Sequence, residues 1–325
     1  MRVSMNAEHF MRRAIALSKK GYPAPNPRVG CVLVRNERVI GEGFHAYAGG
    51  PHAEVVALAN ATESTVGSIA YVTLEPCNHR GRTEPCSLAL VEAGVQKVVF
   101  AVSDPNRVAS GGAEFLRSKG IQVEEMLRAT EAADVNWAFL TAHKRQRAVC
   151  VVKVATTLDG RIARIRGEST AITSSRARRE GRRLRAEMGA VLVGSGTYLV
   201  DNPKLTVRLP SIANEPHRIV LDGSARLRAL PKGMLHWTGE LHPTEVLDTL
   251  WQMGATGVLV EGGAETIYRF FEARVVDRVE IFLAPKVFGE GLTWLENHVE
   301  AEMEIIRVRK LGPDLQISLR VLQKK

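Results

Sequence analysis

The chain has 325 residues, more than one compact core usually holds, and its 45% hydrophobic and 24% charged residues exclude a disordered or collagen-like protein. No apolar run approaches the roughly 20 residues of a membrane-spanning helix, and the N-terminus lacks the apolar core of a secretory signal, so we expect a cytoplasmic protein without a membrane partner. The net charge of +9 fits nucleic acid, a small phosphorylated substrate or a solvated basic surface, and charge alone does not choose among them.

The first half of the chain alternates helical and strand-like patterns, which indicates an α/β domain with helices packed on a sheet. Apolar periodicity and composition predict helices over 8–20, 52–60 and 129–144. The same signals predict buried strands over 29–34, 69–74 and 97–102. A basic stretch then precedes a new buried strand, so we place a domain boundary there and expect domains 1–146 and 147–325.

The second half repeats the α/β rhythm. Strands are predicted over 148–155, 190–194, 218–221, 257–261, 278–283 and 315–322, and helices over 176–188 and 243–253. The stretch 224–242 shows no strand pattern. Six arginines between Arg176 and Arg185 spread around the first of these helices, so we expect most of them to be solvated and one or two to be left for a phosphate.

Four residues of the first half form a metal-binding pattern: His52 and Glu54 in a His-x-Glu triplet at a helix start, then Cys77 after a strand, then Cys86. We expect a second helix to begin at Glu75-Pro76-Cys77. The order matches the zinc deaminase signature, in which one His and two Cys hold Zn²⁺ and leave its fourth position to water. Zinc lowers the pKa of this water to about 7, and zinc hydroxide attacks the ring carbon that carries the amine. We therefore expect one zinc per chain and Glu54 as the proton carrier.

Each of these residues alone has a plain structural explanation, because cysteine is commonly buried and a histidine at a helix start is often a cap. Their order, spacing and strand-to-helix context together favour the motif. The other two cysteines, Cys31 and Cys150, stand in apolar strand patterns and are expected to be buried thiols.

Eight residues separate the two cysteines, where the general signature has two. This loop, Asn78-His-Arg-Gly-Arg-Thr-Glu-Pro85, together with Pro25-Asn26-Pro27-Arg28-Val29-Gly30 and the His-Ala-Glu triplet, resembles the bifunctional deaminase-reductase family of riboflavin biosynthesis. Cytidine and tRNA adenosine deaminases share the zinc residues but lack the loop. The resemblance implies a cytidine-deaminase-like α/β/α domain in the first half.

The resemblance also implies a substrate. It is a phosphorylated pyrimidine, a diaminopyrimidinone with a ribosylamino 5-phosphate, and its 2-amino group leaves as ammonia. Asn26, His79 and Arg82 are the residues that the resemblance offers for the ring or the phosphate. For Asn26 the local alternative is a turn residue between two prolines.

The second half resembles the reductase domain of the same family, a dihydrofolate-reductase-like α/β domain that uses NADPH and no metal. Landmarks are Lys153-Val-Ala-Thr-Thr-Leu-Asp-Gly-Arg161, Asp201-Asn-Pro-Lys-Leu205 and Glu261-Gly262-Gly263. The hydride is expected at the ribose C1 of the ring-opened imine, giving a ribitylamino product. Gly262 and Gly263 let backbone N–H groups meet a cofactor phosphate, although a plain strand-to-helix turn uses the same residues.

The resemblance implies roles for individual residues of this half. Those expected to face NADPH are Ala155, Ala171, Thr197, Asp201, Gly223, Gly263, Ala264, Glu265, Thr266, Ile267, Tyr268 and Arg269. Those expected to face the substrate are Lys153, Ser169, Arg185, Leu205, Arg208 and Glu261, with Arg185 and Arg208 suited to its phosphate.

Three departures from the family pattern stand in the second half. Ala171 replaces a usual Trp, Gly223 replaces a common Ser, and the stretch 223–258 is shorter than the family norm by a few tens of residues. A deaminase with a scaffold in place of a reductase is therefore the alternative. A nucleic-acid binder is disfavoured because only 6% of residues are aromatic and no basic strip is interleaved with them. We expect a small-molecule enzyme, a homo-oligomer, with no nucleic-acid partner.

Overall fold

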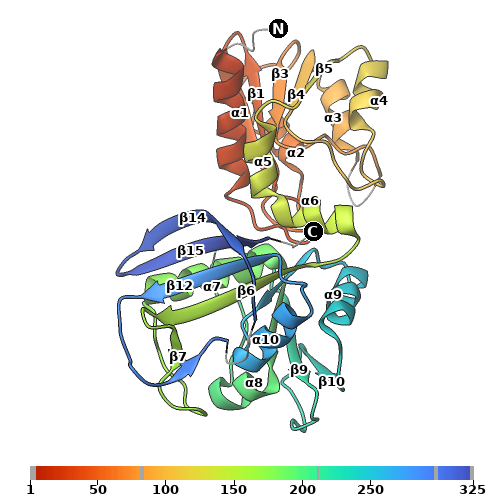
Figure 1. The fold of residues 1–325 in the computed structure, drawn as a ribbon. Coiled ribbons are helices and arrows are strands. Elements are labelled where there is room, and N and C mark those ends of the chain that lie inside the picture. The colour runs from red at the N-terminus through yellow and green to blue at the C-terminus, as the bar shows by residue number, and fades with distance from the viewer. Residues whose placement is uncertain (1–4, 81–83, 211, 296–298, 323–325) are drawn as a thin grey trace. The chain divides into compact units, whose positions relative to one another are not determined.

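The structure, a computed structural model, describes residues 5–80, 84–210, 212–295 and 299–322. It divides into two compact units, Met1–Arg145 and Gln146–Lys325, and this division lies one residue before the predicted boundary (Figure 1). Among the described residues, no helix is both long and apolar enough to cross a membrane.

The first unit holds one five-stranded sheet and six described helices. Its helices are α1 (Met5–Ser18), α2 (Ala53–Ala59), α3 (Cys86–Glu92), α4 (Gly112–Ser118), α5 (Ala129–Val135) and α6 (Trp137–Arg145). Its strands are β1 (Gly30–Arg35), β2 (Arg38–Phe44), β3 (Ile69–Val72), β4 (Lys97–Phe100) and β5 (Gln122–Glu125). Their order is β2-β1-β3-β4-β5, with β1 antiparallel to both neighbours and β3, β4 and β5 parallel.

Side chains of β1 alternate between two apolar cores, as the period of a strand requires. Cys31 and Leu33 pack with residues of α2, α3 and α4 on one face of the sheet. Val32 and Val34 pack with residues of α1 and α5 on the other face. The unit is therefore a three-layer α/β/α structure, and β2 and β5 are strands that the sequence pattern missed.

The predicted helix over 129–144 is wrong in one respect, because it is two helices that meet at Asn136. The side-chain amide of Asn136 accepts a hydrogen bond from the Arg28 N–H at 2.8 Å and donates one to the Arg28 carbonyl at 2.9 Å. An asparagine that satisfies a distant backbone segment in this way competes with its own helix, so the helix breaks there.

Two glycines of β2 place α2 directly on the sheet. A Cβ atom at Gly41 would lie 2.4 Å from the Ala57 carbonyl oxygen, and one at Gly43 would lie 2.3 Å from the Ala53 carbonyl oxygen. Neither position has room for a side chain, so the helix start at His52 is held close to the sheet.

The second unit is built on an eight-stranded sheet. Its helices are α7 (Ser175–Met188), α8 (Ser195–Asp201), α9 (Pro243–Gln252) and α10 (Ala264–Glu272). Its strands are β6 (Val149–Thr157), β7 (Arg161–Ala163), β8 (Ala190–Gly194), β9 (His217–Asp222), β10 (Met234–Thr238), β11 (Gly257–Val260), β12 (Arg278–Ala284), β13 (Leu292–Thr293), β14 (Met303–Leu311) and β15 (Asp314–Val321). The large sheet has the order β10-β9-β8-β11-β6-β12-β15-β14, and β13 pairs with β7 in a small separate sheet.

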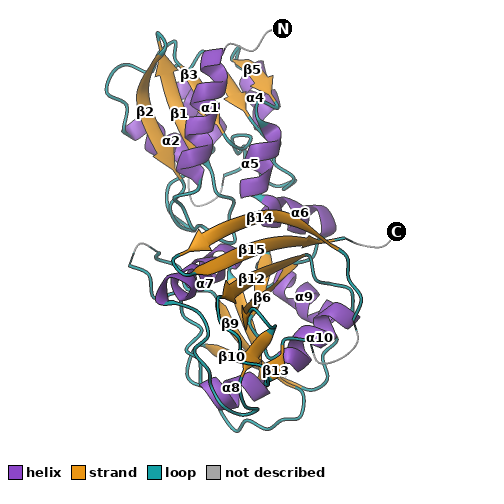
Figure 2. Ribbon diagram, turned by 60° about the vertical axis from the view of Figure 1, so that its left-hand side comes forward, coloured by secondary structure: helices purple, strands orange, loops and turns teal. Residues whose placement is uncertain are grey.

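The strands from β10 to β12 run parallel, and β15 and β14 add an antiparallel hairpin at one edge. Val152 and Val154 of β6 pack into a core with α9 and α10 on one face of the sheet (Figure 2). Lys153, between them, points to the opposite face, where its side chain lies 3.7 Å from the Cβ position of Gly181 on α7. Helices therefore cover both faces of the sheet.

The expectation that 224–242 contains no strand is wrong. Met234–Thr238 forms β10, which pairs in parallel with β9 at the edge of the sheet. Its side chains are only partly buried, because an edge strand has a neighbour on one side, so the apolar signal is weak. The charged strand β14 at the opposite edge was missed for the same reason.

Candidate active sites

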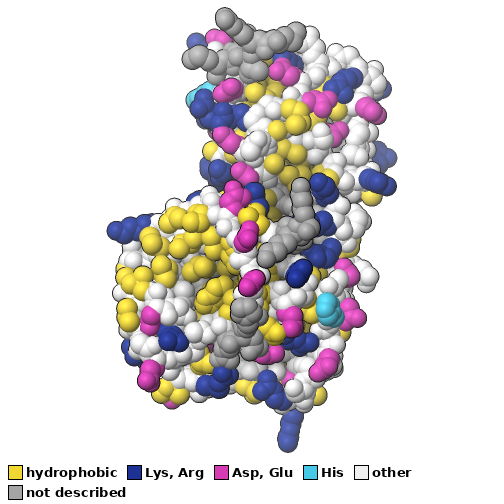
Figure 3. Space-filling model, viewed as in Figure 1, with side chains coloured by type: hydrophobic (Ala, Val, Ile, Leu, Met, Phe, Trp, Pro, Cys, Tyr) yellow, Lys and Arg dark blue, Asp and Glu magenta, His cyan; other side chains and the backbone are white. Residues whose placement is uncertain are grey.

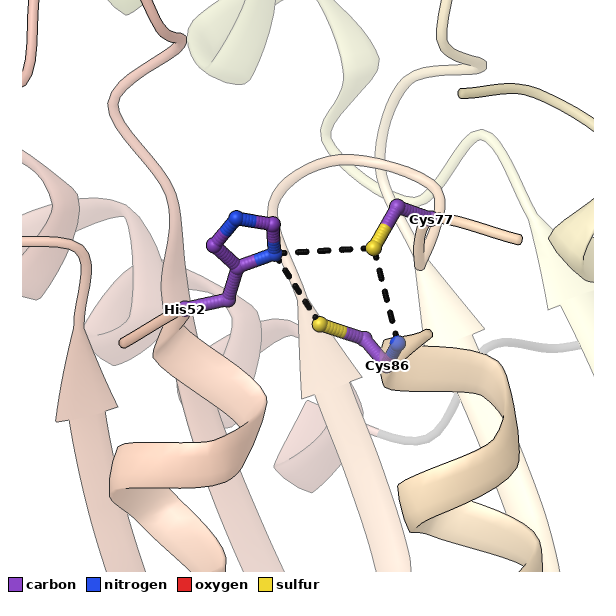
Figure 4. Close-up of side chains that lie close together, drawn as sticks. All are labelled: His52, Cys77 and Cys86. Carbon is purple, nitrogen blue, oxygen red and sulfur yellow. Dashed lines mark hydrogen bonds between the residues drawn. The ribbon is translucent and has the colours of Figure 1, made fainter. Parts of the chain in front are cut away.

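Three predicted metal ligands come together in the first unit, as Figure 4 shows. His52 immediately precedes α2, Cys86 begins α3, and Cys77 lies in the irregular segment after β3. The Nδ1 atom of His52 lies 3.2 Å from the Cys86 sulfur and 3.5 Å from the Cys77 sulfur. All three donor atoms lie within 4.8 Å of one another, so they fit a single ion with His52 bound through Nδ1.

The helix expected to begin at Cys77 is absent, and the next helix starts at the second cysteine. The cause is Glu75, two residues before Cys77. Its carboxylate accepts hydrogen bonds from the backbone N–H groups of Asp104, Gly111 and Ala113 at 3.0–3.2 Å. These bonds tie the chain after β3 to a distant loop and hold Cys77 in an irregular segment.

Burial and sulfur contacts set the protonation of the site. Contact with the Cys86 thiol and with His52 lowers the pKa of Cys77 to about 4, whereas the same pairing raises the pKa of Cys86. Burial raises the pKa of Glu54 to about 7, assisted by the nearby Cys77 sulfur. Glu54 is 3% exposed and sits in the first turn of α2. A carboxyl group with this pKa can both accept and release a proton near neutral pH.

Asn26 is held by a histidine that the sequence pattern did not single out. Its Nδ2 atom lies 3.1 Å from His45 Nε2, and His45 Nδ1 lies 3.0 Å from the Pro51 carbonyl oxygen. Because a carbonyl only accepts, Nδ1 carries the proton and Nε2 accepts from the amide, which fixes the orientation of Asn26. The His45 ring also packs edge-on against His52, with ring centroids 5.1 Å apart. A lone histidine after a strand has no motif that would have revealed it.

Of the other two predicted substrate residues of this unit, the structure describes only His79. The Nδ1 atom of His79 is buried and has no hydrogen-bond partner among the described residues. Nearby Asp104, whose pKa burial raises to about 6, was not predicted. Arg82 lies outside the described residues.

The second unit contains a cavity of about 1140 Å³ bounded by the ends of β6, β8, β9 and β11 and by α8 and α10. The predicted cofactor residues that line it are Ala155, Ala171, Thr197, Asp201, Gly223, Gly263, Ala264, Glu265, Thr266, Ile267 and Arg269. Tyr268 is not in the lining, and its hydroxyl donates to Glu272 one turn further along α10 at 2.5 Å. Seven successive residues of a helix cannot all face one side, which explains the exception.

The turn from β11 into α10 requires its glycines for packing. A Cβ atom at Gly262 would lie 2.7 Å from the Thr266 Cβ, and one at Gly194 would lie 2.3 Å from the Thr266 hydroxyl oxygen. The Gly263 N–H donates to the Thr197 hydroxyl at 2.8 Å. The two strand ends therefore approach α10 closely, and the turn leaves its backbone at the cavity wall.

Charged residues gather around Glu261, which lines the cavity. Arg185 donates two hydrogen bonds to the Glu261 carboxylate, at 2.6 and 3.0 Å, and a third to the Thr206 carbonyl at 2.9 Å. Lys153 Nζ lies 3.8 Å from the same carboxylate. Burial alone would raise the pKa of Glu261, but Arg185 and Lys153 bring it below its ordinary value, so the carboxylate is ionised.

The structure places the predicted substrate residues in two groups. Lys153, Ser169 and Glu261 line the cavity, whereas Arg185, Leu205 and Arg208 are not in its lining. Leu205 is buried in a small apolar cluster with Val191, Val193 and Val220. Arg208 is exposed, and like Leu205 it has a positive φ.

Each of the two units matches a known protein family. Residues 4–102 match the family model of the cytidine and deoxycytidylate deaminase zinc-binding region, and residues 148–317 match that of the RibD C-terminal domain. The riboflavin biosynthesis protein RibD of Aquifex aeolicus is 37% identical over 348 aligned positions, which cover 95% of this chain and 97% of the relative. These positions outnumber the 325 residues here, so the relative contains residues that this chain lacks.

Two solved structures are similar over nearly the whole chain. Acinetobacter baumannii RibD, form 1, has a TM-score of 0.90 at 36% identity and covers 98% of this chain and 99% of its own. A Thermotoga maritima structure described as a diaminohydroxyphosphoribosylaminopyrimidine deaminase/5-amino-6-(5-phosphoribosylamino)uracil reductase has a TM-score of 0.86 at 34% identity, with the same coverage.

The fold and the two sites define a zinc-type deaminase joined to a reductase. Both predicted fold classes are confirmed, the cytidine-deaminase-like α/β/α domain and the dihydrofolate-reductase-like α/β domain. The chain belongs to the RibD family of riboflavin biosynthesis proteins. It is a bifunctional deaminase and reductase, and the prediction of two activities is confirmed over that of a deaminase with a scaffold. The two domains imply zinc and NADPH as cofactors.

Proposed function

We propose that the chain removes the 2-amino group of a diaminopyrimidinone that carries a ribosylamino 5-phosphate, and then reduces the ribose with NADPH. The single observation that carries the proposal is the buried Glu54 beside three converging metal donors, His52, Cys77 and Cys86. The similarity to the Thermotoga maritima deaminase/reductase supports the choice of substrate.

In the first unit, His52, Cys77 and Cys86 would hold one zinc per chain. Zinc bound there supplies a Lewis acid that makes water a stronger acid at neutral pH. Glu54 takes a proton from the attacking water and delivers it to the departing ammonia. Its raised pKa suits it to both transfers. The oriented amide of Asn26 and the His79 Nδ1, which has no hydrogen-bond partner in the described part of the chain, are proposed to hold the substrate.

In the second unit, NADPH bound in the cavity would supply the hydride. The predicted cofactor residues that line the cavity are proposed to bind it, and Lys153, Ser169 and Glu261 to face the substrate. Glu261 keeps the Lys153 ammonium and the Arg185 guanidinium in place. Arg208 is proposed to bind the phosphate with help from Arg185. Burial lowers the pKa of Arg182, and the neighbouring Arg208 and Arg185 lower it further. This gathering of positive charge favours a dianion.

The substrate test supplies the diaminopyrimidinone phosphate to the full chain loaded with zinc and identifies the products by mass. Without NADPH we expect the deaminated compound and one ammonia per turnover. With NADPH we expect the ribitylamino compound and one NADPH oxidised per product, followed by its absorbance. Ammonia release without any NADPH oxidation would contradict the proposed reductase, and no ammonia release would contradict the proposed deaminase.

We also propose that the chain forms a homo-oligomer through a second copy at β14. Figure 3 shows apolar side chains gathered on the part of the second unit that carries β14 and β15. Ile305 and Val308 of β14 are 64% and 54% exposed, on the last strand in the described sheet. Exposed apolar side chains on an edge strand favour contact with the same side chains of a second copy, although β14 also carries charged residues.

The mass of the chain in solution tests this interface. Light scattering should give a multiple of 35.6 kDa for the natural chain and the monomer mass for an Ile305→Lys, Val308→Lys double variant. Val66→Lys, at an exposed apolar residue of the first unit, is the matched control and should keep the larger mass. A monomeric natural chain would contradict the proposal.

A further inference from the structure

The segment that begins at the end of β7 forms an open wall of the cavity in the second unit. Most residues of this wall segment, 163–173, line the cavity, and Ser169 and Ala171 are among them. Residues 164–169 are exposed, and Ile172 is the first buried residue after them. The position of Ser169 therefore depends on how the chain is held where it becomes buried again.

Charged side chains hold the backbone of three successive residues at this point. The Lys286 ammonium donates to the Ile172 carbonyl at 2.6 Å. Arg178 donates to the carbonyl of the next residue, and Asp314, which is 2% exposed, accepts from the Ser174 N–H at 2.8 Å. Hydrogen bonds with one charged partner are stronger than those between neutral groups. The end of the wall segment is therefore fixed to the rest of the unit.

Lys286 is itself part of a well-held stretch of backbone. It follows β12, and its carbonyl accepts from the Leu158 N–H at 2.8 Å, just after the end of β6. The Asp159 carboxylate accepts from the N–H groups of Phe288 at 3.1 Å and of Gly289 at 2.7 Å. The ammonium therefore reaches the wall segment from a backbone that is already in place, so its contact is preorganised.

Lys286 differs from Arg178 in its relation to the cavity. Arg178 is in the cavity lining and can contact a ligand directly, whereas Lys286 is not in the lining. Lys286 therefore acts on the reaction through the backbone that it holds. Small displacements matter here, because a misplacement of about 1 Å can lower the rate of a positioned reaction by about 10²-fold.

We propose that Lys286 is a positioning residue of the reductase, which holds the wall segment so that Ser169 meets the substrate. The proposal rests on the proposed function of Ser169 in substrate binding. Without the ammonium, the Ile172 carbonyl loses this donor and the wall segment is less ordered. Substrate binding must then order it, so the loss falls on the affinity for substrate.

The test measures steady-state reduction of the deaminated substrate by the full chain at saturating NADPH. For Lys286→Met we expect the KM of the substrate to rise by about 10-fold, as for a lost hydrogen bond from a charged group, with a smaller change in kcat. Because Lys286 is exposed, the variant should fold. Its Kd for NADPH, measured by calorimetry, should stay close to that of the natural chain. Lys286→Arg, which keeps a charged donor, should recover part of the loss.

A double variant shows whether Lys286 acts through Ser169. Ser169→Ala should raise the KM by itself. Lys286→Met combined with Ser169→Ala should match Ser169→Ala alone to within about twofold, because the ammonium has no hydroxyl left to position. Lys232→Met is the matched control, at an exposed lysine of the same unit outside the cavity lining, and it should leave the KM unchanged.

An unchanged KM in Lys286→Met, or independent effects that multiply in the double variant, would overturn the proposal and leave the proposed reductase intact. An NADPH Kd that rises as much as the substrate KM would also overturn it, because that result indicates a general loss of packing. An unchanged KM in Ser169→Ala would overturn the substrate role of Ser169 and the proposal together with it.

Discussion

Replacing Glu54 with glutamine should reduce ammonia release by about 10²- to 10⁴-fold, the usual contribution of a positioned general acid-base. Glutamine keeps the volume of the side chain, so the buried site beside α2 should still fold. It cannot accept a proton from water or give one to the leaving amine, and this loss acts on the turnover number. Ammonia release from the diaminopyrimidinone phosphate, at saturating substrate, measures the effect.

The matched control is Glu63→Gln, at an exposed glutamate of the same unit, which should keep full activity. The Glu54 variant should retain its zinc and should still oxidise NADPH with substrate that is already deaminated, because that cavity is lined by residues of the second unit. Loss of both activities in a folded, zinc-loaded Glu54 variant would contradict independent sites.

Replacing Cys86 with alanine should abolish tight zinc binding and deamination together. The variant leaves His52 and Cys77 as donors, whereas an open catalytic site needs three protein ligands. Zinc content after dialysis against a weak chelator should fall from one ion per chain to near zero, measured by atomic absorption. Cys31→Ala is the matched control, since Cys31 is buried in the apolar core of the same unit and should not be needed for zinc.

Full zinc and full activity in the Cys86 variant would show that another residue is the third ligand. The structure makes this a sharp test, because the sulfur atoms of Cys77 and Cys86 both lie within 3.5 Å of the same His52 nitrogen. No other group of three or more donors that could hold a metal occurs in the described ranges of the chain.

The three metal donors, His52, Cys77 and Cys86, were predictable because local signals lie beside them. A helix starts at His52, and a proline precedes each cysteine. The surroundings of these donors were not predictable. His45 carries no motif, and its role depends on contacts with Asn26 and Pro51 that are formed only in the fold. The same holds for the helix break at Asn136, whose partner Arg28 lies more than a hundred residues away in sequence.

In the second unit, the buried parallel strands were predictable from their apolar runs, whereas the edge strands β10 and β14 were not, because they bury little. The resemblance supplied a continuous run of cofactor residues along α10, and helix periodicity removes Tyr268 from it.

The two hydrogen bonds between Asn136 and Arg28 connect an early segment of the first unit with a late one. The amide side chain engages both backbone groups of Arg28, as a neighbouring strand would, and Arg28 follows Asn26 by two residues. The loop that presents Asn26 to the deaminase site is thus closed by a segment from the far end of the unit. A separated deaminase unit would need the chain at least through this asparagine, although the sheet itself is complete at Glu125.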